Sequence, residues 1–233
     1  MGEQKQYDPD KYERPSVTVD IVILTLRESK LQVLLIQRKN WPYAGSWAIP
    51  GGFVEMNESL EAAARRELAE ETGVDDPAIH LEQLHTFGDP GRDPRMRVIS
   101  VAHMALVPDG QLALRAASDA SDAGWFPAYD PPPLAFDHDQ ILSCAIGRLR
   151  SQVETTPAIF RLLPETFTLT ELQSAYEHVL REDLDKRNFR RKMLSSDLLA
   201  ETQQLRSGDH RPAKLYRLQE DAAGRHKAQR PYP

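Results

Sequence analysis

The 233-residue sequence predicts an α/β domain over residues 15–150, followed by a winged helix-turn-helix domain over residues 158–218. Two observations support this fold class. The first region alternates short apolar stretches, bounded by turn residues, with helical patterns, whereas the second follows the order helix, helix, hairpin. The polar stretch of residues 151–157 is expected to be a linker. Residues 1–14 are expected to form a flexible N-terminus, and residues 219–233 a disordered tail.

In the first region, apolar and β-branched residues predict a hairpin with strands at 17–26 and 31–38. Leu60, Ala64 and Leu68 recur at every fourth position, which predicts a helix over residues 59–72. The remaining expected elements are strands at 81–87, 97–106 and 124–126 and a helix at 137–149. Both faces of the 97–106 segment are apolar, as in a central strand that is covered on each side.

In the second region, Thr168 and Glu171 have the spacing of a capping box, so a helix is expected to begin there. Asp185 is the expected N-cap of the next helix. Strands at 198–205 and 213–218 flank a turn-rich stretch and complete the expected wing.

Composition and charge exclude several classes of protein. Charged residues make up 27% of the chain and the apolar runs are short, so a membrane span is not expected. Cys144 is the only cysteine, which excludes an intrachain disulfide framework, and the N-terminus lacks a secretory signal pattern. We therefore expect a cytoplasmic protein. The net charge of −6 combines an acidic region 1–150 with a weakly basic region 151–233, which indicates different partners for the two parts.

Three glutamates crowd one side of the helix expected at 59–72. Glu67, Glu70 and Glu71 are spaced three and four residues apart, and each like-charged pair costs about 0.2–0.5 kcal/mol. A divalent cation would reverse the sign of this interaction, and oxygen ligands favour Mg²⁺, with Mn²⁺ as a substitute. The alternative is a solvated acidic face that Arg65 and Arg66 neutralise.

The spacing of these residues extends over a longer motif. Gly52 is followed after five residues by Glu58, and after seven more by Arg66-Glu67-Leu68, then Glu70-Glu71 and Gly73-Val74. This arrangement resembles the complete Nudix signature. The resemblance implies an α/β/α sandwich with a mixed sheet over residues 15–150, and hydrolysis of nucleoside diphosphates that are linked to another moiety.

The resemblance also implies roles for individual residues. The metal ligands would be Glu67, Glu70 and Glu71, with Gly51 offering its backbone. Arg66 would hold a catalytic glutamate by a charge-assisted hydrogen bond, and Glu58 would be an accessory carboxylate. The implied catalytic set is therefore Glu58, Arg66, Glu67, Glu70 and Glu71, while the general base stays open.

The substrate is indicated by residues 87–95, which resemble the loop of Nudix enzymes of the ADP-ribose type. Arg92 and Arg95 could clamp a phosphate, or they could pair with neighbouring aspartates instead. Arg38 is a further phosphate candidate at a strand end, and Gly52 allows the backbone to approach the substrate.

Residues 186–192 contain five cations and no acid, and Phe189 and Met193 form an apolar stripe beside them. We expect this segment to bind duplex DNA through Lys186, Arg187, Asn188, Arg190, Arg191 and Lys192. The second region resembles the winged helix of the Nudix-related transcriptional regulators of NAD metabolism, which implies a homodimer that senses ADP-ribose-like metabolites.

Three hypotheses follow. The leading one is a Mg²⁺-dependent hydrolase that converts ADP-ribose-type substrates into AMP and a sugar phosphate, fused to a DNA-binding winged helix. The second is a transcriptional regulator of NAD metabolism whose Nudix pocket binds ADP-ribose as an effector without turnover. The third is a hydrolase whose winged helix serves only dimerisation.

Overall fold

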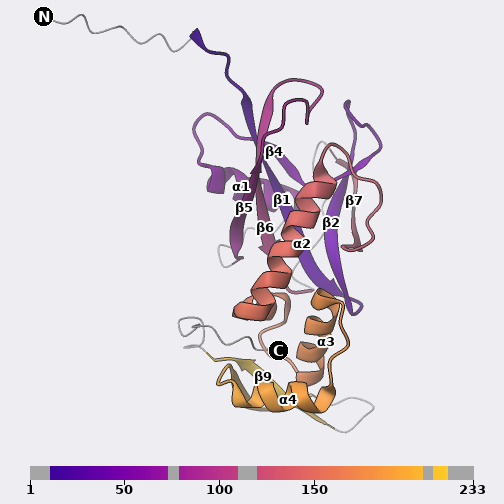
Figure 1. Ribbon diagram of the computed structural model, residues 1–233, viewed down its shortest axis with the longest axis vertical. Helices are drawn as coiled ribbons and strands as arrows, with labels where there is room; N and C mark the ends of the chain where they lie inside the picture. Colours follow the sequence, from indigo (N-terminus) through magenta and orange to yellow (C-terminus); the bar gives the residue numbers. More distant parts are fainter. Residues whose placement is uncertain (1–10, 73–78, 110–119, 207–211, 220–233) are drawn as a thin grey trace, which may run out of the picture.

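The computed structural model describes residues 11–72, 79–109, 120–206 and 212–219, with the side chains of residues 71, 72, 120 and 121 excepted. Figure 1 shows a sheet with one long helix, α2 (His138–Thr155), crossing its front, and a smaller helical domain below it. The segments expected to be a flexible start and a disordered tail lie mostly outside the described residues, and residues 73–78 lie wholly outside them.

The N-terminal domain is built on a mixed sheet of seven strands. Its strands are β1 (Ser16–Arg27), β2 (Lys30–Arg38), β3 (Trp47–Ala48), β4 (Gly51–Phe53), β5 (Leu81–Phe87), β6 (Val98–Leu106) and β7 (Ala120–Pro127). The main path runs β3-β2-β1-β6-β5, with β4 paired to β1 and β7 to β2. Among the described strand pairs of this sheet, β1–β6 is parallel and the others are antiparallel. β6 is buried between two neighbours, which confirms the central strand expected at 97–106.

The sheet is covered on both faces, because side chains of β1 alternate between two hydrophobic clusters. Val19 and Ile21 pack with α1 (Leu60–Thr72), whereas Val22 and Leu24 pack with α2. The expected α/β/α sandwich is thus confirmed. The β1–β2 hairpin turns at Glu28 and Ser29, both with positive φ, as a tight two-residue turn requires.

The prediction of a linker at residues 151–157 is wrong. Residues 151–155 are the last turns of α2, and a 3₁₀ helix, η2 (Pro157–Leu162), follows directly. The helix extends because Val153 follows Ala145 and Leu149 at the same four-residue spacing, so one more turn buries one more apolar side chain. One hydrophobic cluster includes Val153 and runs on through the C-terminal domain. The two domains therefore share a core.

The C-terminal domain has the expected helix, helix, hairpin order, with α3 (Leu169–Leu180), α4 (Lys186–Ser195), β8 (Leu199–Arg206) and β9 (Ala213–Leu218). Thr168 and Glu171 form the predicted capping box, and Asp185 caps α4 by accepting from the Asn188 amide. Within the described part of the chain, we find no helix with the length and apolar character needed to cross a bilayer.

Candidate functional site

Arg66 of α1 is the centre of a cluster of glutamates from α1 and from the segment before it. Its guanidinium donates to both oxygens of Glu58, at 2.7 and 3.1 Å, and to Glu67 Oε1 at 2.7 Å. Glu70 Oε2 lies 3.6 Å away. The hydrogen bond from Arg66 holds the pKa of Glu58 below its usual range, and the pKa of Arg66 is raised in turn, first by the hydrogen bond to Glu58. Arg66 thus orients the Glu58 and Glu67 carboxylates.

Glu67 is buried and lies directly against the backbone of Gly52. A Cβ atom at Gly52 would be 2.1 Å from Glu67 Oε1, so only glycine permits this approach. The expectation that Gly52 lets the backbone approach the substrate stays a prediction; the contact with Glu67 is a separate reason for a glycine here.

The glutamates suit a hard divalent cation in their donor chemistry. Glu67 and Glu70 offer carboxylate oxygens, and Glu70 is half exposed. Among the residues whose side chains are described, no group of three acidic, histidine or cysteine side chains is arranged to hold a metal ion. The side chain of Glu71 falls outside that set, so the predicted trio stays a prediction.

A cavity of about 190 Å³ opens beside Gly52, between β1, β2, β4 and the loop at 88–97. It brings together all the predicted substrate-binding residues, namely Arg38, Gly52, Arg92 and Arg95, together with Gly51. Among the described side chains, Glu67 and Glu70 do not line it, although Glu67 lies behind Gly52. The sequence motif and the cavity are therefore adjacent, with the glycine backbone between them.

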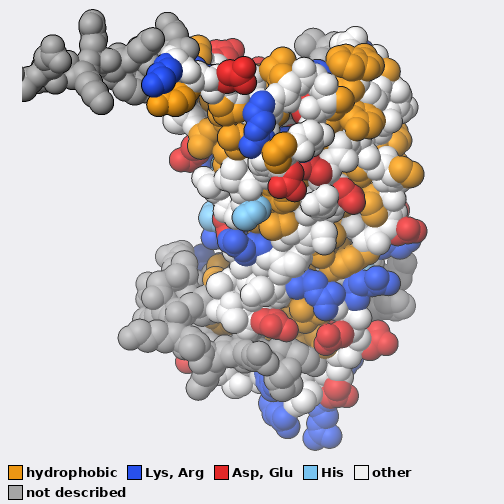
Figure 2. Space-filling model, turned by 45° about the horizontal axis from the view of Figure 1, so that its top comes forward, with side chains coloured by type: hydrophobic (Ala, Val, Ile, Leu, Met, Phe, Trp, Pro, Cys, Tyr) orange, Lys and Arg blue, Asp and Glu red, His pale blue; other side chains and the backbone are white. Residues whose placement is uncertain are grey.

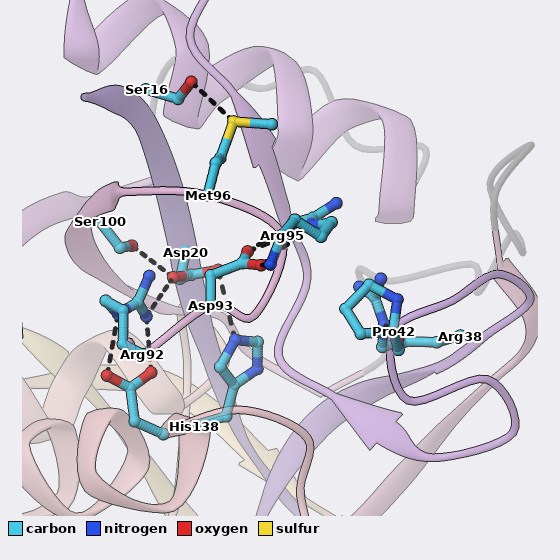
Figure 3. A network of polar contacts seen from close by, with 11 residues as sticks. Ser16, Asp20, Arg38, Pro42, Arg92, Asp93, Arg95, Met96, Ser100 and His138 are labelled. Carbon is cyan, nitrogen blue, oxygen red and sulfur yellow. Dashed lines mark hydrogen bonds and ion pairs between the residues drawn. The ribbon is translucent and has the colours of Figure 1, made fainter. Parts of the chain in front are cut away.

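Buried charges form the floor of this cavity (Figure 3). Arg92 donates to both oxygens of Asp137, at 2.6 and 2.9 Å, and lies 3.7 Å from Asp20. Asp20 accepts a hydrogen bond from Ser100 and lies 3.7 Å from the ring of His138. Only 5% of the Arg92 side chain is exposed. This arginine is accordingly a structural part of the floor, paired with acids distant in the sequence.

The other two predicted arginines lie at the cavity wall. Arg95 pairs with Asp93 through contacts of 2.7 and 3.0 Å, which is the alternative considered for it. Arg38 donates to the Pro42 carbonyl at 2.9 Å, and its guanidinium lies 4.8 Å from the ring centroid of Phe136. The guanidinium of Arg95 lies 5.8 Å from the same ring.

Sequence reasoning missed Asp20, Trp41, Phe136 and His138, all of which line the cavity. Asp20 carried a signal, because it is a lone acid in an otherwise apolar strand. Phe136 has a positive φ of 57°, which is uncommon for a bulky residue and invisible in the sequence. Burial lowers the pKa of His138, whose Nδ1 accepts from the Ile49 amide. The ring is therefore held neutral.

Chemically, the cavity combines arginines with exposed aromatic rings and an accessible glycine backbone. Guanidinium groups bind phosphate oxygens in pairs, and flat rings such as Trp41, 70% exposed, can stack on a base. These features suit a nucleotide with a diphosphate group.

A second candidate interface lies on α4, at the opposite end of the molecule. Phe189 and Met193 are buried, and Phe189 packs edge-to-face on Tyr176 of α3 at a centroid distance of 5.6 Å. Lys186, Arg187 and Arg191 are exposed. Figure 2 shows Lys and Arg side chains at the lower end of the molecule, where Figure 1 places α4. One face of α4 thus docks on the domain and the other is positively charged.

Comparison with known proteins agrees with this architecture. Residues 15–143 match the NUDIX domain family, and residues 159–218 match the NrtR DNA-binding winged helix domain. The fold and the site thus define a Nudix-domain protein with an attached winged helix. More particularly, the chain belongs to the NrtR family, since it is 39% identical over 217 residues to the ADPR responsive transcriptional repressor NtrR of Acinetobacter baylyi. That alignment covers 91% of this chain and 86% of the relative.

Solved structures extend the similarity. Shewanella oneidensis NrtR in complex with a 27mer DNA superposes with a TM-score of 0.79 at 39% identity, over 92% of this chain and 98% of that one. The Nudix domain of the same Shewanella protein, solved with ADP ribose, gives a TM-score of 0.56 at 39% identity, over 64% and 99%. The ADP-ribose pyrophosphatase of Methanocaldococcus jannaschii is 42% identical over 141 residues, which is 59% of this chain and 79% of the enzyme.

Proposed function

We propose that the protein is a transcriptional regulator of NAD metabolism that binds duplex DNA through α4 and binds ADP-ribose in the cavity beside Gly52. The observation that carries this proposal is the combination, in one chain with a shared core, of a polar cavity lined by three arginines and a helix with an exposed basic face. The similarity along almost the whole chain to a repressor named as ADPR-responsive supports it.

The cavity supports an effector role because of its link to the C-terminal domain. Asp137, which Arg92 holds at the cavity floor, immediately precedes α2. The far end of α2 contacts η2, and α2 also contacts α3. Tyr129 of the N-terminal domain donates directly to the Val179 carbonyl of α3. A ligand in the cavity can therefore influence the position of the winged helix through packed elements.

The test is a duplex-binding assay with the full-length protein and the DNA upstream of its own gene, with and without ADP-ribose. We expect salt-sensitive binding whose apparent affinity changes when ADP-ribose is added. Two results would contradict the proposal: no binding to any duplex, or binding that ADP-ribose leaves unchanged at saturating concentration.

A second candidate function is hydrolysis of ADP-ribose-type compounds to AMP and a sugar phosphate. The specific observation in its favour is the complete signature, from Gly52 to Val74, with Arg66 holding Glu58 and Glu67 in place. When bound, Mg²⁺ would supply positive charge that offsets the diphosphate and acidifies water. The glutamates would hold the ion, and Arg66 would hold the Glu67 carboxylate in position.

The experiment for this second function measures AMP release from ADP-ribose with Mg²⁺, comparing wild type with Glu71→Gln. We expect the wild type to release AMP and the variant to release none, with unchanged circular dichroism. A wild type that is inactive on a panel of nucleoside diphosphate compounds, with Mg²⁺ and with Mn²⁺, would leave the regulator as the sole function.

A further inference from the structure

We propose that the bonded pair Arg191 and Asn188 of α4 reads base edges, whereas Lys186 and Lys192 contact the phosphate backbone on either side. This inference rests on the proposed DNA binding and deepens it, because it assigns specificity and general affinity to different side chains. Among DNA-binding helices these are separate tasks, since phosphate contacts carry no direct sequence information.

The orientation of α4 on its domain decides which of its side chains point outward. Phe189 and Met193 are fully buried, so the direction midway between them points into the core. With about 100° of rotation per residue, Arg191 lies about 180° from this direction, at the outermost line of the helix. Arg187 lies about 40° from Arg191 on one side and Asn188 about 60° on the other, whereas Lys186 and Lys192 lie about 100–140° from it. A helix that enters a groove with its core face outward therefore presents Arg191 to the bases, with the exposed Arg187 and the Asn188 side chain beside it.

The side chains of Arg191 and Asn188 are in contact with each other. The Arg191 guanidinium donates to the Asn188 side-chain oxygen, one turn earlier on the same face. This bond restricts the rotamers of a long side chain before DNA is met, which lowers the entropy lost on binding. The remaining guanidinium donors stay available, and their planar fork matches the O6 and N7 acceptors of guanine in the major groove.

Three other cations of the domain pair with groups of the protein itself. Arg190 donates to the Thr170 hydroxyl at 3.2 Å, which holds it against α3. On the described wing strands, Arg206 pairs with Glu171, and Lys214 Nζ lies 2.6 Å from Glu201. The outer face of α4 is therefore the surface of this domain from which cationic side chains can bind in a DNA groove.

The frame that aims α4 is also well defined. Arg181 adopts a left-handed conformation at the end of α3, and the Leu184 amide donates to Glu177 at 3.0 Å. Gln173 bridges the turn by donating to both Glu177 and the Leu184 carbonyl. This bonded turn sets the angle between the two helices, so the direction of Arg191 follows from the fold.

The experiment starts from a pool of randomised duplexes from which the full-length wild type selects a preferred sequence. Binding is then measured for that duplex and for every single-base substitution, using the wild type, Arg191→Ala, Asn188→Ala and the matched control Lys186→Ala. At a guanine position, we expect the wild type to discriminate by about 5- to 150-fold and Arg191→Ala to lose this preference. Asn188→Ala should weaken preference at an adjacent position. Lys186→Ala should lower the affinity for all duplexes equally and reduce the salt slope by about 1.

The outcomes separate the two levels of the argument. If wild type selects no sequence and binds no duplex, the proposed DNA binding fails. If wild type selects a sequence and Arg191→Ala keeps every base preference, the assignment of Arg191 is wrong while the proposed function stands. Thermal unfolding of each variant identifies any loss of fold, and Arg191→Lys provides a second test because lysine retains the charge without the fork.

Discussion

Replacing Arg92 with methionine tests whether the charge network under the cavity holds the N-terminal domain together. The Arg92 side chain is 5% exposed, and its partners Asp137 and Asp20 are 15% and 9% exposed. Methionine has a comparable length, so the main loss is the positive charge. Two carboxylates would then share a buried site without a cation. Removing one partner of a buried pair costs about 3–5 kcal/mol.

The complementary variant, Asp137→Asn, is expected to cost less. Arg92 would still have Asp20 at 3.7 Å, so its charge would keep one counter-ion. We therefore expect a loss of about 1–3 kcal/mol, from the hydrogen bonds to a charged group. Arg92→Met should therefore destabilise the protein more than Asp137→Asn, because Arg92 neutralises two acids whereas Asp137 neutralises one cation.

The assay is urea unfolding, followed by circular dichroism, with Arg148→Met as the matched control. Arg148 contacts Glu82 at 2.6 Å, but its side chain is 41% exposed, so its removal should cost less than about 1 kcal/mol. The reasoning is refuted if Arg92→Met lowers the unfolding midpoint no more than Arg148→Met does, or if Asp137→Asn is the more damaging of the two.

Three further predictions concern single positions. Gly52→Ala should reduce ADP-ribose affinity at least tenfold in isothermal calorimetry, because the new Cβ would lie 2.1 Å from Glu67 Oε1 and displace that carboxylate. An unchanged affinity would show that the position of the Glu67 carboxylate does not affect ADP-ribose binding. Thr168→Ala removes the capping box with Glu171 and should lower the free energy of unfolding by about 1 kcal/mol in urea titrations, with Thr168→Ser close to wild type. Burial lowers the pKa of His138 from 6.5 in the folded protein, so below about pH 6.5 the unfolded chain binds a proton that the folded chain does not. The free energy of unfolding should therefore fall as the pH drops through this range, and less steeply in His138→Gln. An equal dependence of the free energy of unfolding on pH in both proteins would contradict this prediction.

The local elements could largely be predicted from the sequence. The hairpin of β1 and β2, the central strand β6 and the order of the winged helix all depend on periodicity and turn residues within a few positions. The capping box at Thr168 and the cap at Asp185 were predictable for the same reason, since each joins residues three apart. Arg66 donates hydrogen bonds to Glu58 and Glu67, whose spacing the signature fixes, while the catalytic roles of these residues stay predictions.

By itself, the sequence determined the element order, the signature on α1 and the basic face of α4, because these depend on neighbours along the chain. Only the tertiary structure decided that α2 continues into the shared core and that Arg92 pairs with Asp137. Such pairs join residues 45 positions apart, and their partners are chosen by strand register and helix docking. A buried cation must find an anion in the folded state, but its sequence neighbours do not say which one.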